Sequence, residues 1–412
     1  MTATPVSKAG GGTGKIDPQR PEVADVFRTH GDAYRESRSL PMPHLKAMRG
    51  IETCRTAELG GHLYECDLCG YEHPAYNSCR NRHCPKCQAL AKARWLEARS
   101  SELLPVTYFH NVFTLQHELN PWIRHNKKII CDILFQSVSR TLLEFGANTE
   151  NGLGGRLGFL AVLHSWDQRL LEHHHLHCII PGGALSFDGK TWVEGDSKYL
   201  FPVKALSIVF RGKFMDSLEK AFDRGEIASP DGKDFKQLLV MLRKNRWVVY
   251  SKPSFAGPEK VLDYLARYAY RVAISNDRIR KFENGEVTFS YKDRKNGNRK
   301  KETTVSAEEF IRRFLSHVLP DGYMKIRYFG FLGNRHKQEN ISLIRTLLDV
   351  PAKQEMVEKK KPEELFLYLT GKDITKCPKC KTGTMIIRQT IPKPPTRASP
   401  RISNAPAGID SS

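Results

Sequence analysis

Six cysteines fall within 34 consecutive residues of this 412-residue chain: Cys54, Cys66, Cys69, Cys79, Cys84 and Cys87. A cluster this dense restricts its segment to a small domain held together by disulfides or by metal. No apolar run approaches the roughly 20 residues of a membrane span, and residues 1–17 lack the apolar stretch of a secretory signal. We therefore expect a cytoplasmic protein whose reduced thiols bind metal.

Two CxxC pairs give the cluster a zinc-ligand pattern. Cys66–Cys69 and Cys84–Cys87 are separated by 14 residues; each turn directs two thiolates at one point, and tetrahedral zinc needs two such turns. A possible second Cys2His2 set consists of Cys54, His62, Cys79 and His83. The sequence thus predicts one or two structural zinc ions. If there are two, the ligands of one ion can alternate along the sequence with those of the other. For the two histidines, an exposed side chain or a phosphate contact is the alternative.

The net charge of the chain is +20, from 65 Lys and Arg against 45 Asp and Glu. A surplus of this size predicts a polyanionic partner, with nucleic acid favoured over an anionic membrane surface. Arg80, Arg82 and Lys86 lie among the zinc ligands, so the cysteine-rich segment is a candidate DNA-binding domain. The alternative is a metal-stapled domain whose charges only solvate it.

The remaining pattern indicates an α+β protein with a sheet that carries helices on one face. We expect strands at residues 106–115, 157–164, 175–180 and 247–251, and a basic hairpin at 278–282 and 287–291. Helices are expected at residues 88–103, 121–145, 207–224 and 235–243.

The third of these strands begins with a run of histidines that includes His173, His175 and His177. Side chains alternate along a strand, so His175 and His177 point to the same face and can hold one metal ion. A divalent cation such as Mg²⁺ or Mn²⁺ needs further ligands. Gln168, in the segment that leaves the neighbouring strand, is the favoured third ligand; His164 and His173 are the alternatives.

A helix that begins near Pro258 carries Tyr264 and Tyr268 one turn apart, hence on one face. Together with a metal site, this pair predicts cleavage of a phosphodiester by tyrosine attack, in which the covalent phosphotyrosine keeps the energy of the broken bond. Two tyrosines would allow two sequential transfers. Arg267 and Arg271 could hold flanking phosphates. The alternatives are helix packing for the tyrosines and a solvated face for the arginines.

Several segments resemble one known family. CRTAELGGHLYECDLCG and YNSCRNRHCPKCQ are similar to the zinc-binding domain of the insertion sequence ninety-one family of bacterial transposases. VLHSWDQ and HHHLHCIIPGGALS resemble its HUH motif, DYLARYAYRVAISNDRI its tyrosine helix, and KIRYFGFLGNRHK its C-terminal signature. The matches occur in order over roughly residues 50 to 345.

The resemblance implies a Y2-type HUH endonuclease that acts on single-stranded DNA in rolling-circle-like transposition, with a Rep-like antiparallel sheet and flanking helices. It assigns metal binding to His175 and His177, and the nucleophile to Tyr264 and Tyr268. If one tyrosine suffices, we expect it to be Tyr268. The implied partners are single-stranded DNA and the ends of the element, with neither a membrane nor a small-molecule substrate.

The expected organisation is a largely disordered segment (1–40), a zinc-binding domain (41–103), an endonuclease domain (104–345), a helical linker with the Cys377–Cys380 knuckle (346–390) and a disordered tail (391–412). Cys377 and Cys380 form half a zinc site that another region or another chain would have to complete. Two other functions stay open: a plasmid replication initiator or relaxase with the same chemistry, and a zinc-dependent DNA-binding protein without catalysis.

Overall fold

The computed structural model describes residues 20–150, 152–253, 261, 270, 272–293, 296–350 and 361–395. The chain divides into two compact units: residues 1–52 and 80–373 form unit 1, and residues 53–79 and 374–412 form unit 2. Each unit is described by itself below. The domain boundaries expected from the sequence differ from this division and stay a prediction.

Unit 1 is built around a five-stranded sheet whose neighbouring strands all pair antiparallel, in the order β12-β4-β5-β3-β8. The strands are β3 (Tyr108–Thr114), β4 (Gly158–Trp166), β5 (Glu172–Pro181), β8 (Val248–Pro253) and β12 (Ile326–Gly330). The expected α+β class with an antiparallel sheet and flanking helices is confirmed, and β5, which carries the histidine run, lies at its centre.

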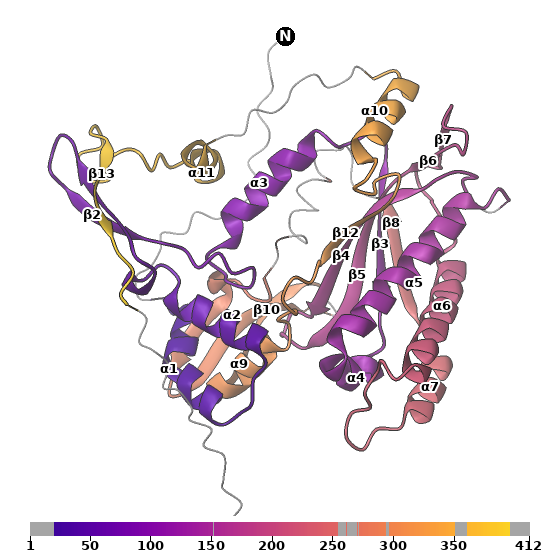
Figure 1. Cartoon of the computed structure of the whole chain (residues 1–412), viewed down its shortest axis with the longest axis horizontal. Helices are drawn as coiled ribbons and strands as arrows, with labels where there is room; N and C mark the ends of the chain where they lie inside the picture. Colours follow the sequence, from indigo (N-terminus) through magenta and orange to yellow (C-terminus); the bar gives the residue numbers. More distant parts are fainter. Residues whose placement is uncertain are drawn as a thin grey trace, which may run out of the picture. The chain divides into compact units, whose positions relative to one another are not determined.

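Helices cover one face of this sheet, as Figure 1 shows for α5, α6 and α7. They are α4 (Asn120–His125), α5 (Lys127–Ala147), α6 (Val203–Asp223) and α7 (Phe235–Lys244). Because side chains alternate along a strand, Leu176, Cys178 and Ile180 of β5 all point into this helical core. Burying such a core is the main source of stability for a unit of this size.

The single helix expected at 121–145 is divided in two at Asn126, and its side chain explains the break. Its Nδ2 donates to the carbonyl oxygens of Trp122 (3.0 Å) and Ala228 (2.8 Å), and its Oδ1 accepts from the Ala228 N–H (2.9 Å). An asparagine that bonds to the backbone in this way competes with the helical ladder.

The opposite face of the sheet carries a smaller cluster made by Tyr108, Leu160, Val162, Ile179 and Val261. Trp95 of α3 (Gln88–Ser100) packs against this cluster. The sheet is therefore covered on both faces near these residues. The remainder of this second face carries the candidate site described below.

The rest of unit 1 contains a hairpin, a second sheet and further helices. The hairpin is β6 (Gly183–Leu185) with β7 (Trp192–Glu194); the second sheet is β9 (Ile279–Glu283), β10 (Glu286–Asp293) and β11 (Arg299–Ser306); the helices are α1 (Val23–Glu36), α2 (Met42–Thr53), α9 (Ala307–Leu315), α10 (Lys337–Leu347) and α11 (Pro362–Thr370). Strand β11 was not expected, because its basic sequence lacks the apolar alternation of a half-buried strand.

The disorder expected for most of residues 1–40 is wrong for the stretch that forms α1. Phe27 of this helix packs edge-on against Phe314 of α9, with ring centroids 5.3 Å apart, and Val23 and Val26 are buried beside it. Such apolar burial is enough to order a helix that the composition alone does not reveal.

Unit 2 contains one antiparallel sheet of three strands in the order β13-β1-β2. The strands are β1 (Gly61–Cys66), β2 (Glu72–Tyr76) and β13 (Met385–Ile391). Strands β1 and β2 come from the cysteine-rich segment, whereas β13 is separated from them by about 300 residues of sequence. Among the described residues, no helix is both long and apolar enough to cross a membrane.

Candidate metal centres and the nucleic-acid cavity

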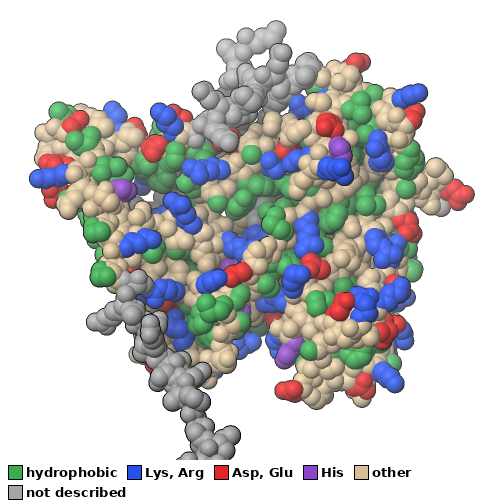
Figure 2. Space-filling view, viewed as in Figure 1, with side chains coloured by type: hydrophobic (Ala, Val, Ile, Leu, Met, Phe, Trp, Pro, Cys, Tyr) green, Lys and Arg blue, Asp and Glu red, His purple; other side chains and the backbone are tan. Residues whose placement is uncertain are grey.

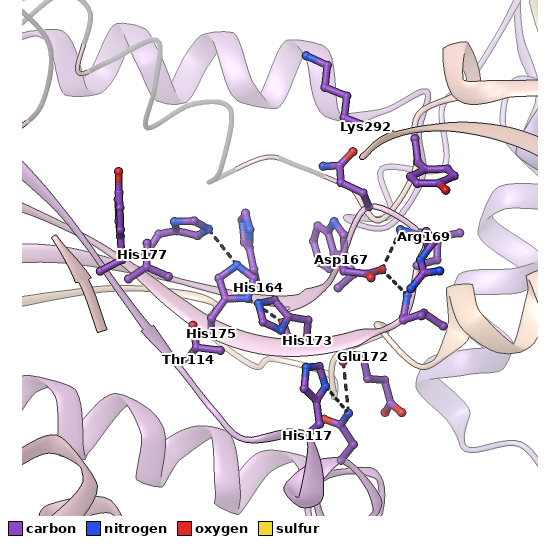
Figure 3. A pocket seen from close by; sticks show the side chains of 18 of the residues that line it. Thr114, His117, His164, Asp167, Arg169, Glu172, His173, His175, His177 and Lys292 are labelled. Carbon is purple, nitrogen blue, oxygen red and sulfur yellow. Dashed lines mark hydrogen bonds between the residues drawn. The ribbon is translucent and has the colours of Figure 1, made fainter. Parts of the chain in front are cut away.

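Strands β4 and β5 bring three histidines together on the face opposite the helices. In the antiparallel register, His164 is paired with His175 and Val162 with His177, so all three imidazoles project to the same side. One ring nitrogen from each lies within 4.8 Å of the other two. The expectation that His175 and His177 share a face is confirmed by this register, and Figure 3 shows the three side chains side by side.

Hydrogen bonds at the other ring nitrogens orient two of these histidines. The Nδ1–H of His175 donates to the carbonyl oxygen of His173 at 2.7 Å, which leaves Nε2 of the neutral ring as an acceptor. Nδ1 of His177 lies 2.8 Å from Nε2 of His110 on β3. If His177 donates there, its Nε2 also carries a lone pair.

The two Nε2 atoms of His175 and His177 face each other at 3.1 Å. Two lone pairs at this distance repel unless a cation or a shared proton lies between them. Imidazole nitrogen is a common ligand of divalent metals, and ligating histidines normally donate their second nitrogen to a neighbouring acceptor. These residues therefore fit a divalent cation.

For the third ligand, the geometry favours His164, which the sequence left as an alternative. Its ring is buried and stacks on Trp166, with centroids 5.0 Å apart. Gln168 lines the same cavity, and its backbone carbonyl accepts a hydrogen bond from Arg278. Its role as a ligand stays a prediction. The His173 ring stacks with His117, with centroids 5.5 Å apart, and its carbonyl serves His175.

Sequence reasoning missed His110. Alternation along β3 puts His110 on the same face as Tyr108 and Val112, and only the pairing of β3 with β5 shows that this face also carries His175 and His177. Burial lowers the pKa of His110 to about 4, which keeps the ring neutral near pH 7. A neutral ring can accept the hydrogen bond that orients His177.

The histidines lie in a cavity of about 1240 Å³ in unit 1. Its charged lining is mostly basic: Arg124, Arg169, Lys252, Lys292 and Arg312, with Asp167, Glu172 and Asp293. Aromatic side chains of Trp166, Tyr250 and Tyr291 also line it. Arg169 and Lys292 are labelled with the histidines in Figure 3. Basic groups between aromatic rings suit an unpaired nucleic-acid strand, whose bases stack and whose phosphates need countercharge.

Tyr264, Tyr268, Arg267 and Arg271 lie outside the described residues, so their roles stay predictions. The residues on either side of the tyrosine segment are described. Val261 belongs to the apolar cluster on the histidine face of the sheet. Tyr270 packs edge-on against Trp95, with ring centroids 6.0 Å apart, and burial raises its pKa. Trp95 packs against that same cluster.

The second candidate metal centre lies in unit 2 and corrects the predicted zinc pairing. Within unit 2, Cys66 and Cys69 meet Cys377 and Cys380, with all four sulfurs within 4.8 Å of one another; the predicted partners Cys84 and Cys87 belong to unit 1. The C-terminal knuckle is thus completed by another region of the same chain. Sequence spacing missed this because the partner CxxC is about 300 residues away.

The second predicted zinc set stays a prediction. Cys54, His62 and Cys79 belong to unit 2 and His83 to unit 1, and neither unit by itself assembles the four. Nδ1 of His62 is buried without a hydrogen-bond partner among the described residues. Nε2 of His83 accepts from the Leu319 N–H at 3.4 Å, and burial lowers the pKa of this histidine to about 3.

Of the three basic residues expected to contact DNA near the zinc ligands, two have protein partners in unit 1. The Arg82 guanidinium donates to the carbonyl oxygens of Tyr323, Leu319 (3.4 Å) and Pro320 (2.7 Å), and Lys86 pairs with Glu22. Arg80 is exposed. Figure 2 shows Lys and Arg side chains spread widely over the visible surface, so basic charge is not confined to the cysteine-rich segment.

The structure thus contains a histidine-lined basic cavity on the antiparallel sheet of unit 1 and a separate four-thiol cluster in unit 2. Two family models match the chain: one described as "Transposase zinc-binding domain" over residues 26–115, and one described as "Putative transposase" over residues 158–340. The chain belongs to the insertion sequence ninety-one family of transposases, as its resemblance predicted. A transposase has DNA as its partner.

Two curated relatives support this assignment. The chain is 48% identical over 376 residues to "Putative transposase y4qJ" of Sinorhizobium fredii, covering 89% of this chain and 94% of that protein. It is 28% identical over 288 residues to the "Transposase for insertion sequence element IS801" of Pseudomonas savastanoi pv. phaseolicola, covering 68% of each. No solved structure matches the chain significantly.

Proposed function

We propose that the protein is an HUH-type, metal-dependent endonuclease and strand transferase that moves its insertion sequence by a rolling-circle-like route. The observation that carries the proposal is the convergence of ring nitrogens from His164, His175 and His177 in a large basic cavity. The described residues that flank the tyrosine segment support it: Val261 belongs to the apolar cluster on the same face of the sheet, and Tyr270 packs against Trp95, which contacts that cluster.

A divalent cation held by His175, His177 and His164, with Gln168 as a further candidate, would polarise the scissile phosphate and stabilise charge on the leaving oxygen. The Tyr264 or Tyr268 hydroxyl attacks phosphorus and loses its proton. The bond between phosphorus and the 3′-oxygen breaks, and that oxygen leaves as a hydroxyl once protonated. The product is a 5′-phosphotyrosine link, which a free 3′-hydroxyl can later attack to restore the diester without an external energy source.

The lining of the cavity favours single-stranded over duplex DNA. Trp166, Tyr250 and Tyr291 offer faces on which bases can stack, and such stacking requires unpaired bases. Arg169 and Lys292 supply positive charge on the same lining. Arg267 and Arg271 are proposed to hold the flanking phosphates, and the exposed Arg80 to contribute to DNA binding near the cysteine-rich segment.

A replication initiator or relaxase would use the same chemistry on a different substrate. The names of both curated relatives and of both family models favour transposition, so the ends of the element are the proposed substrate. A DNA-binding protein without catalysis would not need three histidines arranged for a metal in a cavity suited to a single strand.

The test is covalent capture of DNA. Purified protein is mixed with labelled single-stranded oligonucleotides that tile the ends of the element, with and without Mg²⁺ or Mn²⁺, and denaturing gels reveal any adduct. We expect a metal-dependent adduct that disappears in Tyr264→Phe/Tyr268→Phe and in His175→Ala/His177→Ala. Tyr270→Phe and His125→Ala, at an exposed histidine of α4, are the matched controls. Binding without adduct on single strands and duplexes alike would refute the nuclease proposal.

A further inference from the structure

The four sulfurs in unit 2 have the spacing of a tetrahedral metal site. Cys66 Sγ lies 3.7 Å from Cys380 Sγ, and Cys69 Sγ lies 3.7 Å from Cys377 Sγ. In a tetrahedral site with a Zn–S bond of about 2.3 Å, neighbouring sulfurs are about 3.8 Å apart. A disulfide needs sulfurs at about 2.05 Å. The observed distances therefore match four thiolates around one ion and exclude two bonded pairs.

Backbone amides also point at these sulfurs. The N–H groups of Cys69, Lys379 and Gly383 donate to Cys66 Sγ (3.5 Å), Cys377 Sγ (3.4 Å) and Cys380 Sγ (3.3 Å). Hydrogen bonds of this kind favour the thiolate over the thiol, and the thiolate is the form that binds metal. Both CxxC turns are thus shaped for ligation, although they lie at opposite ends of the sequence.

The two turns are joined by a strand pairing whose register shifts once, between Leu63 and Tyr64. Strand β13 pairs with β1 from Gly61↔Ile391 to Cys66↔Met385, and Asp67 exchanges hydrogen bonds with Thr384: its N–H donates to the Thr384 carbonyl at 3.1 Å, and its Oδ1 accepts from the Thr384 N–H at 2.8 Å. At Gly383 an added Cβ would lie 2.4 Å from Cys66 Sγ. The approach of the C-terminal turn to Cys66 therefore requires glycine.

We propose that Cys66, Cys69, Cys377 and Cys380 bind one structural zinc ion, and that residues 374–391 are an integral half of the zinc-binding domain. The matched zinc-domain model ends at residue 115 and so includes only two of these four ligands. The domain is discontinuous: its sheet and its metal site are both closed by the C-terminal segment. Because metal binding and folding are coupled in small sites of this kind, neither half forms the structure alone. This inference is independent of the proposed nuclease chemistry.

The first test measures zinc bound per full-length chain. Cys377→Ser/Cys380→Ser and Cys66→Ser/Cys69→Ser are each expected to lose one zinc equivalent relative to the unmodified protein, and the quadruple variant is expected to lose no more than either. Lys376→Ser/Lys379→Ser changes two exposed residues of the same turn and is the matched control, expected to keep all zinc. Full zinc in Cys377→Ser/Cys380→Ser, or additive losses in the quadruple variant, would overturn the proposal.

A second measurement uses the unmodified protein and does not depend on the folding of variants. Cysteines are alkylated before and after a zinc chelator is added, and the labelled positions are identified by mass spectrometry. Cys66, Cys69, Cys377 and Cys380 are expected to be protected together and to become reactive together, and zinc or Co²⁺ should restore the protection. Reactivity of Cys377 and Cys380 while Cys66 and Cys69 stay protected contradicts a shared ion.

Discussion

His177 is held at both of its ring nitrogens, one near His175 Nε2 at 3.1 Å and the other near His110 Nε2 at 2.8 Å. The first contact marks the position proposed for the metal, and the second fixes the direction of the ring. A ligand that could rotate would lose part of its affinity, since outer hydrogen bonds set the orientation and basicity of ligating histidines. His110 is therefore a positioning residue in this account, because it acts through His177 and not on DNA.

His110→Phe should raise the divalent-metal concentration needed for half-maximal adduct formation by about 10-fold to 100-fold, the range found for lost outer partners of metal ligands. At a saturating metal concentration, the rate of adduct formation should return to most of its value in the unmodified protein. His110→Gln keeps an acceptor close to the position of Nε2 and should recover much of the affinity. Metal titrations without DNA, followed by Mn²⁺ spectroscopy, check the same effect. If His110→Phe bound metal as tightly as the unmodified protein, His110 would not be a positioning residue for His177.

His317 gives a pH prediction for folding in unit 1. Burial lowers its pKa to about 3, and its ring bonds to Leu170 O (3.1 Å) and Ser165 Oγ (3.3 Å). Because the folded pKa lies below the unfolded value near 6.5, the unfolded chain binds more protons between these pH values. The free energy of unfolding is therefore highest above pH 6.5 and decreases as the pH falls below it, by about 2 kcal/mol from this group at pH 5.

Thermal unfolding of the wild-type protein at pH 7 and pH 5 checks this direction, with His317→Gln as the comparison. Glutamine does not titrate, so the variant should lose less stability between the two pH values, even if it is less stable at pH 7. An equal fall in both proteins would show that His317 does not contribute.

At the scale of single elements, Gly383 lies between β13 and Cys380, one of the four cysteines proposed to bind zinc. Gly383→Ala places a methyl group 2.4 Å from Cys66 Sγ and should displace one CxxC turn from the other. We expect loss of one zinc equivalent, or a zinc affinity at least about 10-fold lower in competition with a chelator. Small errors in ligand geometry weaken a tetrahedral site. Lys379→Ala, at an exposed residue of the same turn, is the control. Unchanged zinc retention in Gly383→Ala would argue that the turns do not approach so closely.

Comparison of the elements with the sequence shows which of them short stretches of sequence predict. Strands β3, β4, β5 and β8 and helices α6 and α7 follow predicted segments, because apolar alternation and helical periodicity are short-range signals. The shared face of His175 and His177 follows from the same alternation. The break at Asn126 depends on Ala228, about 100 residues away, and the order of the sheet depends on pairings that no local pattern contains.

The zinc pairing failed for a related reason. Cys66–Cys69 and Cys84–Cys87 are the nearest CxxC pairs in sequence, and proximity in sequence was the only guide to which pairs meet. In the structure, the pairing of β1 with β13 instead brings Cys66 and Cys69 to Cys377 and Cys380. His110 was missed because a single histidine in an apolar strand has no local signal of its own; only the neighbouring β5 gives it a partner.

At the scale of the whole molecule, the net charge of +20 predicts DNA binding that weakens steeply with salt. For single strands, the slope of log K against log salt is about −0.7 for each neutralised phosphate. Arg169→Ala and Lys292→Ala should each reduce the magnitude of this slope by roughly 0.7 on every sequence tested. Titrations of labelled oligonucleotides at several salt concentrations give the slope. Lys220→Ala, on α6 and remote from the cavity lining, should leave it unchanged.

The most direct test of the central claim is to identify the residue that becomes joined to DNA. After reaction with a cleavable single strand and Mg²⁺ or Mn²⁺, trypsin should release Tyr264 in VLDYLAR and Tyr268 in YAYR, so mass spectrometry separates the two. We expect a nucleotide on one or both of these peptides, with fragmentation placing it on Tyr268 and not on Tyr270 in the second. A nucleotide on any other residue, or cleavage of DNA with no covalent link, would contradict it.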